Sequence, residues 1–167
     1  NNCAQCHGSD AKGSKGFPNL TLPVASRLAT DSFDSVKATI TNGRQGAMPP
    51  MAAAVGSSED VKNLANYVLS LSGSPHNELA AQLGKPKFGA CAACHGPDGK
   101  GMKALGAPNL TDKVWLHGWG EDAIVAIVTN GKNNQMPAQA QRLSAEQIHV
   151  LAAYVWNLSQ TATVAAK

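Results

Sequence analysis

The pentapeptide Cys-x-x-Cys-His occurs twice in this chain, at 3–7 and at 91–95, an offset of 88 residues. This motif is typical of covalent haem c attachment. The two thiols add across the porphyrin vinyl groups, and the adjacent histidine binds the iron. The two copies use all four cysteines of the chain. The sequence therefore predicts two haem c groups, with thioether bonds at Cys3, Cys6, Cys91 and Cys94 and proximal iron ligands at His7 and His95.

A zinc site and a redox-active dithiol are the alternative uses of these residue types. A structural zinc ion takes four ligands, whereas each copy has two cysteines and one histidine in register. A dithiol requires neither the following histidine nor the Met-Pro pair found downstream in both copies. Haem attachment accounts for all of these features.

Sequence identity between the two copies extends well beyond the haem motif. The string Pro-Asn-Leu-Thr occurs at 18–21 and 108–111, Asn-Gly at 42–43 and 130–131, and Met-Pro at 48–49 and 136–137. The string Leu-Ala-x-Tyr-Val likewise occurs at 64–68 and 151–155, and the order is kept with offsets between 87 and 90, which indicates two tandem copies of one fold. We expect domains at 1–73 and 79–160, a linker at 74–78, a tail at 161–167, and a truncated leading helix in the first domain.

Helical periodicity dominates both copies. Apolar positions at 33, 36 and 40 form one helical face that ends at Asn42-Gly43, and 124, 127 and 128 do the same before Asn130-Gly131. Ser144 and Gln147 have capping-box spacing at the start of the last helix. A leading helix at about 77–91 is interrupted by Gly84 and Pro86. Alternating strand patterns are absent from the sequence, so we expect an all-α fold of two domains, each wrapped around one haem.

The composition is compatible with this assignment. The hydrophobic core of a domain of about 80 residues gives only marginal stability, so such a domain needs a further stabilising feature. A covalently bonded haem supplies it. The formal charge of +3 is offset by four propionates, so we expect no nucleic-acid or membrane-surface partner. The longest aliphatic run, Ala123–Val128, is far shorter than the about 20 residues of a membrane span.

Haem is attached to this motif outside the bacterial cytoplasm. We therefore expect a leader or membrane anchor before Asn1, and a soluble, periplasmic location for this part of the chain.

The distal iron ligands are expected to be Met48 and Met136, each 41 residues after the histidine of its own copy and each followed by proline. Thioether sulfur suits a low-spin haem iron and raises its potential. Met51 is an alternative in copy one, and His117 is an alternative in copy two. Two protein ligands on each iron leave no position for a substrate, which favours one-electron transfer over catalysis.

Each copy resembles a class I cytochrome c domain in the order haem motif, Pro-Asn-Leu, Met-Pro, and a final helix with a tyrosine. The resemblance implies that the carbonyl groups of Pro18 and Pro108 accept hydrogen bonds from the proximal histidines. The strings at 107–118, 127–138 and 151–158 resemble more closely the di-haem subunit III, or CcoP, of cbb3-type cytochrome c oxidases. Copy one departs from that pattern at 22–30.

The second resemblance implies a role in aerobic respiration. Electrons would pass from a donor cytochrome c in the periplasm, through two haems, to the mono-haem and catalytic subunits of the oxidase. Membrane contact would come only through segments absent from this chain. Two rival functions are a soluble di-haem shuttle of the cytochrome c4 type and a small di-haem peroxidase, which would need one open or displaceable iron ligand.

Overall fold

The computed structural model describes residues 3–22 and 32–164 and is mostly helical, with one two-stranded sheet. The chain forms two compact units. Unit 1 contains Asn1–Gln45 and Asn134–Lys167, and unit 2 contains Gly46–Asn133. Most of the segment at 22–30, where copy one departs from the family pattern, lies outside the described residues.

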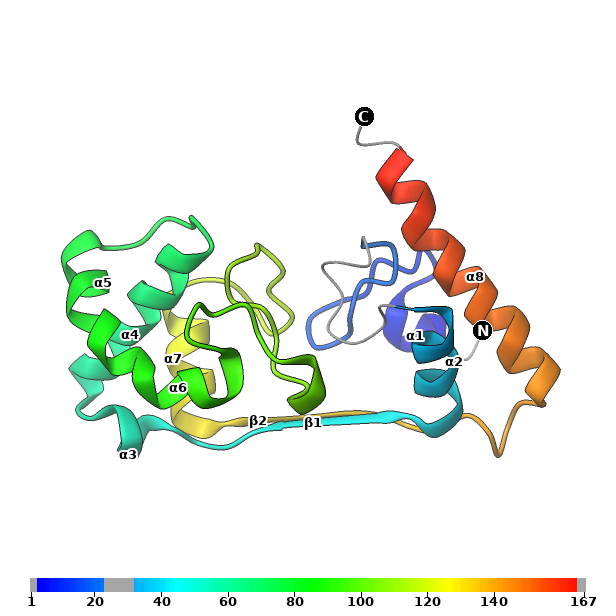
Figure 1. Cartoon of the computed structure of the whole chain (residues 1–167), viewed down its shortest axis with the longest axis horizontal. Helices are drawn as coiled ribbons and strands as arrows, with labels where there is room; N and C mark the ends of the chain where they lie inside the picture. The colour runs from blue at the N-terminus through cyan, green and yellow to red at the C-terminus, as the bar shows by residue number, and fades with distance from the viewer. Residues whose placement is uncertain (1–2, 23–31, 165–167) are drawn as a thin grey trace. The chain divides into compact units, whose positions relative to one another are not determined.

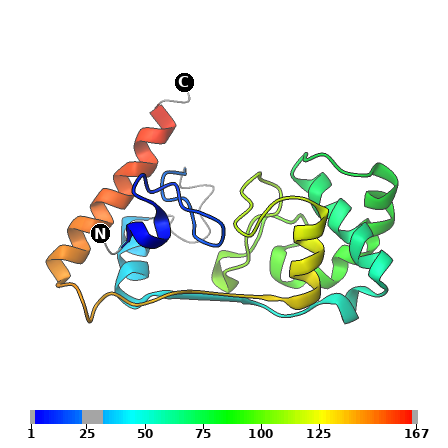
Figure 2. The same ribbon diagram turned by 180° about the vertical axis from the view of Figure 1, so that it is seen from behind.

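Unit 1 contains helices from both sequence copies. Its helices are α1 (Ala4–His7), α2 (Phe33–Asn42) and α8 (Ala145–Val164). Helix α2 lies beside α8 in both views (Figures 1 and 2). Val36 of α2 and Ile148 of α8 are both buried, and the rings of Phe33 and His149 meet edge to face at 5.1 Å.

Unit 2 is arranged around α4 (Ser58–Leu71), which packs on α5, α7 and the 3-10 helix η2 (Figure 1). Its core includes Leu64 and Ala65, both 0 % exposed, together with Phe88, Ile124 and Val128. The other elements are α3 (Ala52–Val55), α5 (Glu78–Gly84), η2 (Lys85–Phe88), α6 (Gly89–His95), η3 (Lys103–Leu105) and α7 (Glu121–Asn130).

Local sequence signals place the helix ends correctly. Gly43 and Gly131 follow α2 and α7 with φ of 70° and 69°, a conformation open to glycine but strained for other residues. The predicted box at α8 is confirmed: the Ser144 N–H donates to Gln147 Oε1 at 2.9 Å, and the Gln147 N–H donates to Ser144 Oγ at 3.3 Å. The predicted interruption of the leading helix is present as the step from α5 to η2.

The sequence patterns did not predict the two strands. Strands β1 (Arg44–Met48) and β2 (Lys132–Met136) pair with each other and are equivalent segments of the two copies. Neither segment has a run of β-branched or aromatic residues. Pairing between two extended segments, rather than intrinsic propensity, therefore forms this sheet.

The compact units are not the two sequence copies. Helix α4 comes from copy one but belongs to unit 2, whereas α8 comes from copy two but belongs to unit 1. The domains expected at 1–73 and 79–160 follow the repeat along the chain, and the packing groups the segments differently.

Candidate haem-attachment sites

The first Cys-x-x-Cys-His motif forms one short helix. Cys3 precedes α1, Cys6 lies inside it and His7 is its last residue. His7 is 9 % exposed, and its Nδ1 lies 2.9 Å from the carbonyl oxygen of Pro18. Because a carbonyl only accepts, Nδ1 carries the proton and donates. The lone pair of His7 Nε2 is therefore left available for a metal ion.

The second motif repeats this arrangement on α6. His95 is 8 % exposed and ends the helix, and its Nδ1 donates to the carbonyl oxygen of Pro108 at 3.0 Å. In both copies a loop glycine donates to the carbonyl oxygen of the histidine, from Gly13 at 2.7 Å and from Gly101 at 2.8 Å. The ring bond from Nδ1 to the proline carbonyl is of the kind that fixes ring orientation and tautomer in metal-binding histidines, whereas the glycine bond holds the backbone of the motif.

Matched side chains also hold the two proline loops. Asn19 Oδ1 accepts hydrogen bonds from the backbone N–H and hydroxyl of Thr21 at 2.8 and 2.7 Å. Asn109 and Thr111 make the same pair of bonds, both at 2.8 Å. Sequence reasoning missed the positioning role of Gly13, Gly101 and the two asparagines, although all four lie at matched positions of the repeat.

The four cysteine thiols are unpaired, as thioether formation requires. Cys3 and Cys94 are exposed, whereas Cys91 is buried in the core of unit 2. Burial raises the pKa of the Cys91 thiol, and the neighbouring Cys94 adds to this effect.

Each candidate distal methionine lies in the unit that contains the motif histidine of the other copy. A pairing within one copy would place it in the unit of its own histidine. Met48 and Met51 pack against the core cluster that contains Cys91. Met136 belongs to unit 1, with His7. Met102 is 40 % exposed, on the short loop after the second motif.

The residues around the second motif fit a haem. The indole Nε1–H of Trp115 is buried, and among the described residues it has no hydrogen-bond partner. Trp115 packs against the cluster that contains Cys91. Buried donors in native proteins are nearly always satisfied, and a haem propionate is an acceptor of the required kind.

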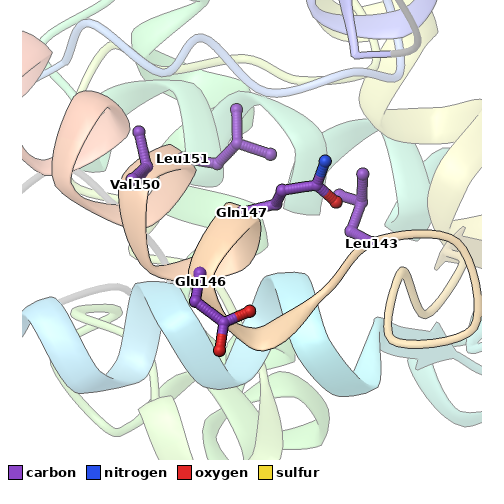
Figure 3. A pocket seen from close by; sticks show the side chains of 5 residues that line it. All are labelled: Leu143, Glu146, Gln147, Val150 and Leu151. Atoms are coloured by element: carbon purple, nitrogen blue, oxygen red, sulfur yellow. The ribbon is translucent and has the colours of Figure 1, made fainter.

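Unit 1 also has a surface hollow at the start of α8. Figure 3 shows that its lining comes from one stretch of chain at the start of α8, with Leu143, Glu146, Gln147, Val150 and Leu151. These side chains include no cysteine, histidine or methionine. In the part of the chain that the structure describes, every helix is too short or too polar to cross a membrane.

Comparison with known proteins gives one consistent family. The family model described as cytochrome c oxidase, cbb3-type, subunit III matches residues 1–68 and 82–155. The chain is 69 % identical over 167 residues to the cbb3-type cytochrome c oxidase subunit CcoP of Rubrivivax gelatinosus, covering 100 % of this chain and 54 % of that protein. It is 42 % identical to the subunit FixP of Azorhizobium caulinodans, covering 94 % and 56 %. The FixP of Sinorhizobium medicae is 38 % identical, covering 94 % and 57 %. The chain thus spans about half the length of these curated relatives.

Proposed function

Because this chain belongs to the family of subunit III of cbb3-type cytochrome c oxidases, we propose that it binds two haem c groups and transfers electrons toward the oxygen-reducing subunit of such an oxidase. The single observation that supports this proposal best is the duplicated site. Two Cys-x-x-Cys-His helices each end in a buried histidine whose Nδ1 donates to a proline carbonyl.

The residues have distinct roles in this proposal. The proximal iron ligands are His7 and His95, and Pro18 and Pro108 orient their rings. The thioether bonds form at Cys3, Cys6, Cys91 and Cys94, and the distal ligands are Met48 and Met136.

The bound haem supplies a reversible one-electron change at iron, and the protein sets the conditions for it. Two protein ligands on each iron leave no position for oxygen or peroxide. The hydrogen bonds from His7 and His95 hold both rings in one orientation, so little has to move when the charge changes. His7 and His95 are 9 % and 8 % exposed, so the protein covers most of each ring.

Other oxidase subunits are proposed as partners because the relatives are named as subunits of such an oxidase, and the donor is proposed from the resemblance in sequence. A donor cytochrome c would deliver electrons on the periplasmic side of the inner membrane. The mono-haem and catalytic subunits would receive them, and oxygen chemistry would take place outside this chain.

The test uses the complete subunit within its oxidase complex. We expect two haem c groups per chain by the pyridine haemochrome assay. Replacing Cys91 and Cys94 with alanine should lower oxygen consumption driven by a donor cytochrome c at least tenfold. Consumption driven by an artificial reductant of the catalytic subunit should be retained. A colourless protein, or one that binds another metal at its thiols, would rule out the proposal. Unchanged donor-driven consumption would favour a shuttle, and substantial peroxide turnover a peroxidase.

A further inference from the structure

Two equivalent backbone hydrogen bonds connect the copies crosswise. The Gln139 N–H donates to the carbonyl oxygen of Ile40 at 3.0 Å, and the Met51 N–H donates to that of Val128 at 2.8 Å. Gln139 and Met51 occupy the same position of the repeat, three residues after the methionine of Met-Pro, and Ile40 and Val128 also correspond. The loop that follows each Met-Pro pair is therefore bonded to the helix end of the other copy.

The Met-Pro segments themselves show the same exchange. A Cβ atom at Gly131 would lie 2.6 Å from the carbonyl oxygen of Met48. A Cβ atom at Gly43 would overlap the carbonyl oxygen of Met136. Each Asn-Gly turn thus packs against the methionine of the other copy, with no room for a side chain between them.

Side-chain contacts show why α4 packs against copy two. Asn66 Nδ2 donates to Glu121 Oε2 at 2.7 Å, and Lys87 Nζ lies 2.9 Å from Asp60 Oδ1. The ring of Tyr67 meets Phe88 edge to face at 5.4 Å. Glu121, Lys87 and Phe88 all belong to copy two, whereas the α4 side chains belong to copy one.

Helix α8 lacks the carboxylate and the amide that make these two polar contacts in α4. At the positions that correspond to Asn66 and Asp60, α8 carries Ala153 and Gln147. Its own pairing is different, since His149 stacks edge to face on Phe33 of copy one. The α4 residue equivalent to His149 is Lys62, which offers no ring. The side chains of each final helix therefore match the other copy.

We infer that the two copies exchange their distal iron ligands: Met136 binds the iron held by His7, and Met48 binds the iron held by His95. This inference rests on the proposed function, because it requires two haems with methionine ligands. It replaces the same-copy pairing that the spacing along the sequence suggests. The only bond formed is the coordination of the methionine sulfur to iron, and its formation does not change the oxidation state of the iron.

The decisive test is nuclear magnetic resonance of the intact, fully reduced chain with 13C-labelled methionine methyl groups. An axial methionine methyl lies over the porphyrin and is shifted strongly upfield. Each methyl is assigned by Met48→Leu, Met51→Leu, Met102→Leu and Met136→Leu. Each porphyrin is assigned by nuclear Overhauser contacts to its own cysteine thioether protons.

We expect the Met48 methyl to contact the porphyrin bonded at Cys91 and Cys94, and the Met136 methyl to contact the other porphyrin. Contacts of Met48 with the porphyrin at Cys3 and Cys6 would overturn the exchange while leaving the proposed function intact. The absence of any upfield methyl would instead argue against methionine ligation, and so against the proposed function.

A second measurement does not depend on methionine variants. A protease site inserted after Gly73, whose Cβ direction is open, cuts the chain between the copies. If the ligands are exchanged, fragments 1–73 and 74–167 should co-elute in size-exclusion chromatography at micromolar concentration with an unchanged absorbance spectrum. The reason is that each compact unit contains segments of both fragments. Fragments that separate, each with its spectrum intact, would overturn the exchange.

Discussion

At the scale of single residues, a glycine permits the hydrogen bond between each motif histidine and its proline loop. A Cβ atom at Gly101 would lie 2.6 Å from the carbonyl carbon of Pro108, and one at Gly13 would lie 2.7 Å from that of Pro18. Side chains at these positions would push the proline loop away from the histidine. The loop reaches the imidazole because both positions lack a side chain.

The first prediction tests this close approach. Gly101→Ala should destabilise the protein by about 1–3 kcal/mol more than Gly106→Ala, because only the first overfills a packed region. Both glycines have positive φ, 80° and 68°, so the backbone strain of alanine is shared. Among the described residues, and apart from its own chain neighbours, nothing lies within 4 Å of a Cβ atom built at Gly106. Denaturant unfolding measures the difference, and equal effects of the two substitutions would argue against the steric account.

The second prediction concerns the methionines. Met136→Ala and Met48→Ala should each convert about half of the haem absorbance from low spin to high spin and lower that haem's potential, since thioether ligation favours ferrous iron. Met102→Ala is the matched control, because this exposed side chain lies on a loop close to the second motif. A low-spin spectrum that persists in Met136→Ala would exclude Met136 as a ligand. A low-spin spectrum that persists in Met48→Ala would exclude Met48 and favour Met51 as the ligand.

At the scale of elements, α4 is attached to η2 through a helix cap that also forms an ion pair. Asp60 accepts a hydrogen bond from the Ser57 N–H at 2.9 Å as part of the capping box, and its other oxygen meets Lys87. The Lys87 ammonium, together with the Ser57 donors, lowers the pKa of Asp60 to about 2. One carboxylate therefore serves both the start of α4 and its packing on η2.

The third prediction follows from that pKa. A carboxyl group whose pKa is lower in the folded protein than its ordinary value of 3.8 contributes stability that is fully present above that value. This contribution is lost as the pH falls toward about 2. Asp60→Asn should therefore reduce the loss of stability between about pH 4 and pH 2, relative to the unchanged protein. Urea unfolding across this range measures it, with Glu59→Gln in the same helical turn as control. Parallel pH profiles for Asp60→Asn and the unchanged protein would refute the ion-pair contribution.

At the scale of the whole molecule, each compact unit depends on both sequence copies. Leu64 is fully buried in α4 of copy one, yet its unit contains the haem motif of copy two. Val36, also in copy one, is buried in the other unit. Two core residues of the same copy should therefore affect different haem sites.

The fourth prediction uses this difference. Leu64→Ala should cost about 2–5 kcal/mol and reduce hydrogen-exchange protection in α5, α6 and α7. Val36→Ala should instead reduce protection in α8. Mass spectrometry of exchanged peptides reports both effects. Loss of protection in α2 after Leu64→Ala, with α7 unaffected, would show that the final helix of copy one packs on its own copy.

The sequence by itself predicted the haem chemistry and determined most of the local structure. The two Cys-x-x-Cys-His motifs, the Asn-Gly helix ends, the cap at Ser144 and the break at Gly84 depend on nearby residues, so they could be recognised along the chain. The two strands could not, because each forms by pairing with a segment 88 residues away rather than from its own propensity.

Only the tertiary structure decided which final helix packs against which haem motif. Val150 of α8 is 66 % exposed, whereas its equivalent Asn63 in α4 is 8 % exposed. Tyr154 of α8 is 59 % exposed, whereas its equivalent Tyr67 packs against the core of unit 2. Repeated sequences present nearly equivalent faces, and periodicity does not distinguish between them. Specific contacts such as Asn66 with Glu121 do distinguish them, and so does the short turn that brings α5 directly onto α4.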